Sequence, residues 1–236
     1  MTEELAARDA YLRQTEASIV GVREDGVVLD RTAFYPRGGG QPGDTGVLRW
    51  EGGEVRVVDT VKRGPDVLHV VEGEPPPPGS PVEVLIDWDR RYYLMRTHTA
   101  LHVLSAIVYR DFGAKVTGGN MDPGRARMDF ELEGISVDLG KQVEERVNEA
   151  LAGEHPVEVR FVPRSEALQD PELIRTKVNL IPEHVDPIRV IDIQGLDRQA
   201  DGGTHVANTR EVGPVRVVKT ESKGKGNKRM RIELDP

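Results

Sequence analysis

Two pairs of metal-ligating residue types, far apart in the chain, restrict the folds that this sequence can adopt. His98 and His102 lie four residues apart in an apolar segment, a spacing that places both imidazoles on one face of a helix. About 100 residues later, Asp201 and His205 repeat that spacing in a glycine-rich stretch. If both pairs bind one ion, the fold must bring the helix and the later stretch together. We therefore predict a metal site made of two halves.

The composition restricts the ligands and the class of protein. The chain has no cysteine, which excludes disulfide bonds and thiolate ligands, so histidine and carboxylate must bind any transition metal. No apolar run reaches the roughly 18 residues of a membrane span, and the N-terminus lacks the basic-then-apolar order of a secretory signal. We expect a globular protein of the cytoplasm, with no membrane partner and no obligate protein partner.

The pattern of residues predicts two regions of different secondary structure. Short, largely alternating strands separated by glycine and proline turns predict a small barrel or sandwich in the first region. The tetraproline at 75–78 lies inside this region, because the strand pattern continues through 81–87, and we place the boundary at residue 88. The predicted strands are 18–22, 26–30, 45–50, 55–61, 67–71 and 81–87.

After residue 90 the pattern changes to mixed helix and strand, which predicts an α+β sandwich. The segment with His98 and His102 is apolar on most sides and predicts a buried helix. A second helix is expected over 139–152, with Gly153 at its end, and a short one over 165–168. Strands are expected at 127–132, 156–162, 188–193 and 214–220, and the last strand pair closes around Gly224 and Gly226.

The charge is unevenly distributed along the chain. The net charge is −8, but from residue 214 onward seven lysines and arginines accompany three acidic residues, so this tail carries +4 and the remainder −12. A basic tail on an acidic body can attract a phosphate backbone. The alternative is a solvated hairpin tip whose lysines serve solubility.

Four separated motifs resemble the editing domain of alanyl-tRNA synthetase and its free-standing relatives of the AlaX type. They occupy residues 32–44, 96–102, 127–130 and 202–213, occur in the family's order and span nearly the whole chain. The resemblance implies an α+β fold, with a small N-terminal β-barrel domain at 1–88 and an α/β sandwich editing domain at 89–236. It also implies an enzyme that, without ATP, hydrolyses serine, and often glycine, from mischarged alanine tRNA.

The resemblance also implies one zinc ion at His98, His102, Asp201 and His205. The family commonly has a cysteine where this chain has Asp201. A carboxylate carries the same charge as a thiolate and can bind zinc directly. Alternatively, the three histidines form the site and Asp201 orients a histidine or water from outside it. The ion can lower the pKa of an attacking water or hold the aminoacyl group in place, and the sequence favours neither role.

Further polar groups are candidates for substrate and tRNA contacts. The substrate-binding candidates are Thr32, Gly39, Gly40, Gln41, Gly202 and Gly203, and the tRNA-binding candidates are Lys223, Lys225, Lys228 and Arg229. Thr32 can hydrogen-bond a serine hydroxyl, and the amides of Gly202 and Gly203 can stabilise an oxyanion. The competing interpretations are a tight hairpin at Gly39 and Gly40, and a simple turn at Gly202 and Gly203.

Four other functions compete with the editing of alanine tRNA. The glycine run lacks the lysine and serine or threonine of a nucleotide-binding loop, so ATP binding is not expected. A zinc peptidase carries glutamate beside its first helical histidine, where this chain has Thr99. A tRNA-binding module without catalysis and editing of threonine tRNA remain alternatives, although the glycine motif favours alanine. His69, His155 and His184 lack metal-ligating neighbours, and we expect structural roles for them.

Overall fold

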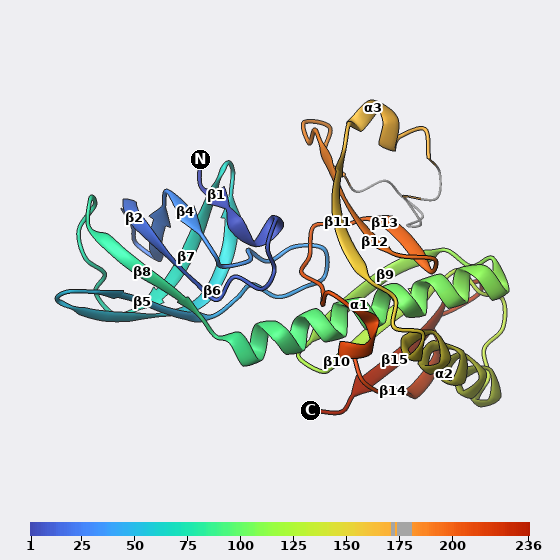
Figure 1. The fold of residues 1–236 in the computed structure, drawn as a ribbon. Helices are drawn as coiled ribbons and strands as arrows, with labels where there is room; N and C mark the ends of the chain where they lie inside the picture. The colour runs from blue at the N-terminus through green and yellow to red at the C-terminus, as the bar shows by residue number, and fades with distance from the viewer. Residues whose placement is uncertain (171–172, 174–180) are drawn as a thin grey trace. The chain divides into compact units, whose positions relative to one another are not determined.

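The chain folds into two compact units, residues 1–93 and 94–236, in a computed structural model that describes residues 1–170, 173 and 181–236 (Figure 1). The first unit is a closed β-barrel and the second combines helices with two sheets. The predicted α+β fold with an N-terminal barrel is therefore confirmed.

The barrel closes because its strands alternate apolar and polar residues around a single core. Its hydrogen-bonded order is β2-β3-β7-β6-β5-β8, and closure leaves no exposed strand edge. Fully buried Val27, Leu29, Phe34, Leu48 and Val84 fill the interior. The six strands are β2 (Gln14–Arg23), β3 (Gly26–Leu29), β5 (Gly46–Trp50), β6 (Gly53–Arg63), β7 (Asp66–Glu72) and β8 (Pro81–Ile86).

A buried ion pair fixes the start of helix α1 (Trp88–Phe112) to the barrel. Arg91 and Asp44 are both at most 1% exposed, and the Arg91 Nε donates to the two oxygens of Asp44 over 3.0 and 2.9 Å. The same guanidinium donates to the carbonyls of Ala10 and Ala33. Because the charges are paired and hydrogen-bonded, their burial is tolerated. The first turns of α1 accordingly belong to the first unit.

The second unit surrounds the rest of α1. Every residue from Thr97 to Val108 is buried, as expected for a helix that is largely apolar all round, and α1 runs between the two sheets (Figure 1). One sheet has the order β14-β15-β10-β9 and the other β11-β12-β13. These strands are β9 (Val116–Asp122), β10 (Arg125–Phe130), β11 (Val157–Val162), β12 (Ile188–Ile193), β13 (Asp197–Ala200), β14 (Val215–Ser222) and β15 (Lys228–Leu234).

Helix α2 (Val137–Ala152) covers the four-stranded sheet at β14. Ser136 caps its N-terminus by accepting the Leu139 amide over 3.0 Å, and the predicted Gly153 follows its last residue. Asn148 exchanges hydrogen bonds with the backbone of Val215, which fixes the helix to the strand. Within the described residues, the other short elements are β1 (Glu3–Glu4), the 3-10 helix η1 (Leu5–Ala7), β4 (Arg31–Thr32), α3 (Arg164–Ala167) and the 3-10 helix η3 (Thr209–Glu211).

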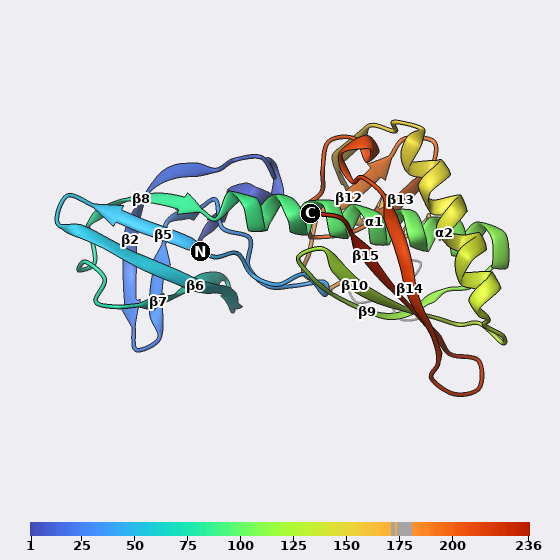
Figure 2. The same ribbon diagram turned by 90° about the horizontal axis from the view of Figure 1, so that it is seen from below.

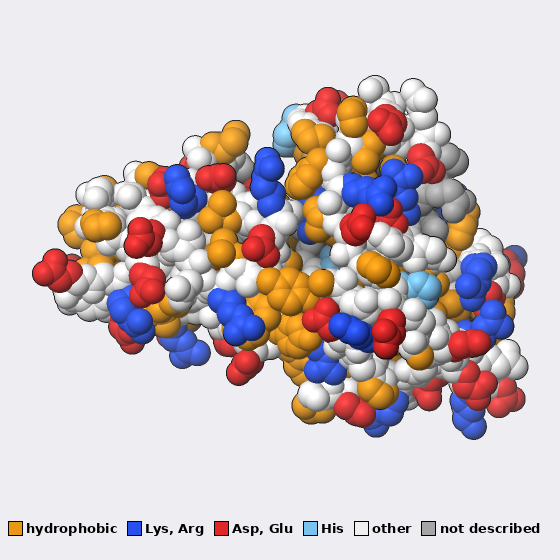
Figure 3. Space-filling view, viewed as in Figure 1, with side chains coloured by type: hydrophobic (Ala, Val, Ile, Leu, Met, Phe, Trp, Pro, Cys, Tyr) orange, Lys and Arg blue, Asp and Glu red, His pale blue; other side chains and the backbone are white. Residues whose placement is uncertain are grey.

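Charged side chains of both signs are interspersed on the face of the molecule seen in Figure 3, so the net charge of −8 produces no uniformly acidic surface there. Within the described residues, no helix has the length and apolar character needed to cross a membrane.

Candidate metal centre

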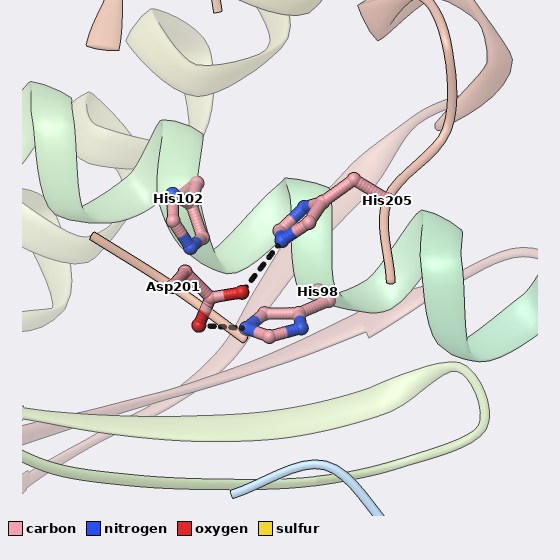
Figure 4. Close-up of side chains that lie close together, drawn as sticks. All are labelled: His98, His102, Asp201 and His205. Carbon is pink, nitrogen blue, oxygen red and sulfur yellow. Dashed lines mark hydrogen bonds and ion pairs between the residues drawn. The ribbon is translucent and has the colours of Figure 1, made fainter. Parts of the chain in front are cut away.

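The structure brings the two predicted halves of the metal site together. His98 and His102 project from α1, and Asp201 and His205 come from the stretch that follows β13 (Figure 4). One ligand atom from each of the four side chains lies within 4.8 Å of all the others. Ligand atoms around a tetrahedral zinc ion, with bonds of about 2.0–2.1 Å, are roughly 3.3–3.5 Å apart. The cluster therefore needs only a small contraction to fit one ion.

The closest contacts within the cluster involve the carboxylate. His205 Nε2 lies 3.1 Å from Asp201 Oδ2, and His98 Nε2 lies 3.6 Å from Asp201 Oδ1 (Figure 4). The ring centres of His98 and His102 are 4.4 and 4.7 Å from that of His205. Each carboxylate oxygen thus faces a different imidazole.

Burial and neighbouring charges shift the pKa values of His98, His205 and Asp201. Burial lowers the pKa of His98 to about 4, with Asp201 opposing that shift, and it holds the pKa of His205 well below its usual value. Burial also acts to raise the pKa of Asp201, but the neighbouring imidazoles outweigh it and hold that pKa well below its ordinary value. Neutral imidazoles and an ionised carboxylate are the forms that bind a metal ion.

Asp197 orients His102 from outside the cluster. Its side chain is fully buried, and Oδ2 lies 3.2 Å from His102 Nδ1 and accepts a hydrogen bond of 2.8 Å from Gln199 Nε2. A proton on Nδ1 leaves Nε2 with its lone pair toward the cluster, the usual carboxylate–histidine–metal arrangement. The sequence analysis did not identify Asp197, because a single aspartate at the start of a strand carries no recognisable spacing.

Thr99 has the corresponding position beside His205. Its hydroxyl lies 3.2 Å from His205 Nδ1 and accepts the Val206 amide over 3.3 Å. Thr99, which in the sequence argued against a zinc peptidase, thus has a structural role, because its hydroxyl fixes the ring of His205. Nothing in the spacing of Thr99 indicated this contact in advance.

Asp201 is held by its own turn and by strand β12. The Gly203 amide donates to Asp201 Oδ2 over 2.6 Å, and Arg189 donates to the Asp201 carbonyl over 2.9 Å. In this structure the Gly203 N–H therefore stabilises the turn, while a Cβ added to Gly202 would meet no atom within 4 Å. An oxyanion role for either amide stays a prediction.

The candidate residues of the first unit form a compact hairpin and a buried hydrogen bond. Gly39 and Gly40 have φ values of 57° and 84° between the bridged residues Gly38 and Gln41, the geometry of a tight primed turn. The hydroxyl of Thr32, which is fully buried, lies 2.8 Å from His69 Nε2 and accepts the Phe34 amide over 3.1 Å. His69 is therefore part of a buried hydrogen-bond pair, and its purely structural role, like the contact of Thr32 and Gln41 with substrate, stays a prediction.

The four predicted tRNA-binding residues fall into two groups. Lys223 and Lys225 are exposed in the loop between β14 and β15. Lys228 is 6% exposed and donates to the Gly224 carbonyl over 2.8 Å. Arg229 forms two hydrogen bonds, of 2.6 and 2.8 Å, with Asp129. The last two side chains thus stabilise the hairpin and the sheet.

Comparison with known proteins matches both units. The protein-family model for class II (A) tRNA synthetases matches residues 7–90. The family model for the second additional domain of threonyl and alanyl tRNA synthetases matches residues 188–231, which include Asp201 and His205. The alanyl-tRNA editing protein AlaX-M of Saccharolobus solfataricus is 41% identical over 243 residues, with 100% of both chains covered. AlaX-M of Methanosarcina barkeri is 39% identical, with 99% of both covered. The alanine–tRNA ligase of Pyrobaculum neutrophilum is 40% identical over 93% of this chain and 25% of the ligase.

Proposed function

The chain belongs to the AlaX-M alanyl-tRNA editing proteins, and we propose that it hydrolyses the aminoacyl ester of alanine tRNA mischarged with serine, with glycine as a second substrate. The full-length likeness to editing proteins supports the class of substrate. Hydrolysis without ATP in the cytoplasm, free of an obligate protein partner, is part of the same proposal. The amino-acid pocket of a tRNA synthetase discriminates poorly between side chains of nearly the same size, such as those of alanine and serine. An editing enzyme removes the resulting errors by hydrolysis.

The convergence of three imidazoles and a carboxylate within 4.8 Å of one another is the observation that carries the catalytic part of the proposal. The donor set of nitrogen and carboxylate oxygen fits one zinc ion. A zinc ion bound there would supply positive charge for polarising the ester or activating a water. His98, His102 and His205 would hold it, with Asp201 as the fourth ligand.

The chain's own residues determine the orientation of this centre. Asp197 and Thr99 fix two of the imidazole rings, and the Gly203 amide keeps the Asp201 carboxylate turned toward the histidines. Preorganised ligands need no rearrangement when the tetrahedral oxyanion develops, which is the main source of electrostatic catalysis. We further propose a glycine-motif domain at 1–88, with Thr32, Gly39, Gly40 and Gln41 contributing to substrate recognition, and an editing domain at 89–236.

The function is tested by deacylation of alanine tRNA charged separately with serine, glycine and alanine. We expect the metal-loaded protein to release serine and glycine and to leave alanine attached. His98→Ala should lose the activity, whereas His155→Ala, a change at a histidine outside the cluster, should retain it. Binding of tRNA without turnover would favour the non-catalytic module, and preferential hydrolysis of serine from threonine tRNA would favour the other editing function.

A further inference from the structure

The outer face of the sheet β14-β15-β10-β9 carries a charge pattern that the metal centre does not explain. On β10 and β15, buried and solvent-facing residues alternate, so that Met128 and Met230 lie inside while Arg127 and Arg231 lie on the outer face. The four strands lie side by side in Figure 2. Their register arranges the outer residues in rows that cross the sheet.

In two of these rows the carboxylates equal or outnumber the cations. In the first, opposite charges alternate, and Arg125 and Arg216 both pair with Glu233, over 3.4 and 3.9 Å. In the last, Arg229 stands between two carboxylates and binds one of them over 2.6 Å. The first row consists of Arg216, Glu233, Arg125 and Asp122, and the last of Glu221, Arg229 and Asp129.

The row between them places three cations on adjacent strands. Lys219 on β14 stands opposite Arg231 on β15, which stands opposite Arg127 on β10, and Asn120 on β9 completes the row. Like charges directly opposite each other on a sheet are destabilising. This arrangement, which we call the cationic row, therefore needs compensation from outside the row.

The neighbouring carboxylates compensate the cationic row only partly. Glu221 is shared by Lys219 and Arg231, over 3.1 and 2.6 Å. Asp129 is shared by Arg127, over 3.3 Å, and by Arg229 of the last row. Four cations thus share two carboxylates, which leaves a local excess of two positive charges on a protein with a net charge of −8.

The shape and exposure of the row suit a large anionic partner. The side chains of Lys219, Arg231 and Arg127 are 61%, 41% and 33% exposed. A hollow of about 240 Å³ on the sheet is lined by Arg127, Arg231 and Asn120 of the cationic row and by Arg125, Asp122 and Glu233 of the first row, so cations outnumber carboxylates by one in its lining. Lys223 and Lys225 extend the positive charge from β14 into the loop of the hairpin, which projects beyond the sheet in Figure 2.

We propose that the cationic row is a docking surface for the phosphate backbone of tRNA. This inference rests on the proposed function and adds the surface by which the substrate is held. Guanidinium groups bind phosphate oxygens through paired hydrogen bonds, and local positive charge directs a polyanion to one part of an acidic protein. Contacts of this kind determine the position of the RNA and read no bases.

The test compares two double variants with the same change of charge. Arg127→Gln with Arg231→Gln removes two cations of the cationic row, and Lys219 and Arg229 still pair with the two carboxylates. Arg146→Gln with Arg160→Gln is the control, because it removes two half-exposed cations that pair with acidic neighbours on α2 and on β11, outside the outer face of this sheet. The dissociation constant of an uncharged alanine tRNA transcript is measured over a range of KCl concentrations, and folding of each variant is verified by its melting temperature.

We expect the cationic-row variant to bind about tenfold more weakly near 0.1 M salt, with the slope of log Kd against log salt reduced by about two. The control should resemble the wild type, and deacylation by the cationic-row variant should show a raised KM with little change in kcat. Equal losses in both variants, unchanged binding in both, or no binding of tRNA by the wild-type protein would each overturn the docking surface. Tight binding through the row by a protein that never deacylates would overturn the proposed function alone.

Discussion

A buried carboxylate outside the cluster determines which nitrogen of His102 can reach a metal ion. Asp197 fixes the proton on Nδ1, and an amide in its place can adopt the opposite orientation and stabilise the wrong tautomer. We therefore expect Asp197→Asn to lower the metal affinity about 10- to 100-fold, the usual effect of losing such a partner. Competition with a chelator of known affinity measures this change.

The matched control for that prediction is Asp192→Asn on the adjacent strand. Asp192 pairs with the half-exposed Arg160 over 3.2 Å and does not contact the cluster. It should leave metal affinity unchanged. If both variants bind metal as tightly as the wild type, Asp197 has no positioning role.

His69 makes the stability of the barrel depend on pH. Its Nδ1 lies 3.2 Å from the Val27 carbonyl and its Nε2 faces the Thr32 hydroxyl, and burial lowers its pKa from 6.5 to about 4. Below pH 6.5 the unfolded chain therefore binds a proton that the folded barrel excludes. The free energy of unfolding should fall as the pH drops from 6.5 to 4, by about 3 kcal/mol from this residue.

Tryptophan fluorescence during urea unfolding measures this effect on the barrel alone, because both tryptophans, Trp50 and Trp88, lie in the first unit. His69→Gln should flatten the dependence between pH 6.5 and 4. His155→Gln, in the second unit, should leave it unchanged. A dependence as steep in His69→Gln as in the wild type would assign the effect to other groups.

At the level of elements, the glycine hairpin of the barrel has a backbone requirement that is independent of substrate. Gly40 has a φ of 84°, a conformation that side chains disfavour, whereas Gly38 lacks a positive φ and has room for a Cβ 3.4 Å from the Tyr35 hydroxyl. Gly40→Ala should therefore lower the free energy of unfolding of the barrel by about 1–2 kcal/mol. Gly38→Ala should change it little.

Urea unfolding followed by tryptophan fluorescence again provides the measurement. A deacylation assay on the same two variants separates the roles of the loop. Loss of activity in Gly40→Ala beyond its loss of folded protein would support substrate contact, and equal stability of the two variants would contradict the turn geometry.

Several elements could be predicted from the sequence because their patterns are local. Strand β12 was predicted over its full extent, and helix α2 to within two residues, since alternation and helical periodicity mark buried faces directly. Strand β9 was not predicted: its residues Val-Thr-Gly-Gly-Asn-Met-Asp are polar and glycine-rich, and only pairing with β10 makes them a strand. The two-residue strands β1 and β4 depend in the same way on tertiary pairing.

At the scale of the whole molecule, the sequence could indicate the four residues of the candidate centre but not the residues that orient them. His98, His102, Asp201 and His205 have recognisable spacings within two short stretches. The contacts of Asp197 and Thr99 exist only because β13 and the following turn pack against α1. The Arg91–Asp44 pair, which joins the start of α1 to the barrel within the first unit, likewise connects residues 47 positions apart.

The same long-range packing explains why the basic tail could be noticed but not interpreted. Composition identified an excess of positive charge after residue 214. Only the register of β14, β15 and β10 separates cations that are neutralised on the sheet, such as Arg229, from those of the cationic row. The structure is therefore needed to identify which cations of the basic tail are left without a carboxylate of their own.

Whether His98, His102, Asp201 and His205 bind one metal ion is decided by the metal content of the purified protein, measured by elemental analysis beside that of His205→Ala. Three imidazoles and a carboxylate from distant stretches converge at one point, so we expect one zinc ion per wild-type chain and a large loss in the variant. A wild-type protein that binds no divalent metal, or a His205→Ala variant that retains a full equivalent, would contradict it.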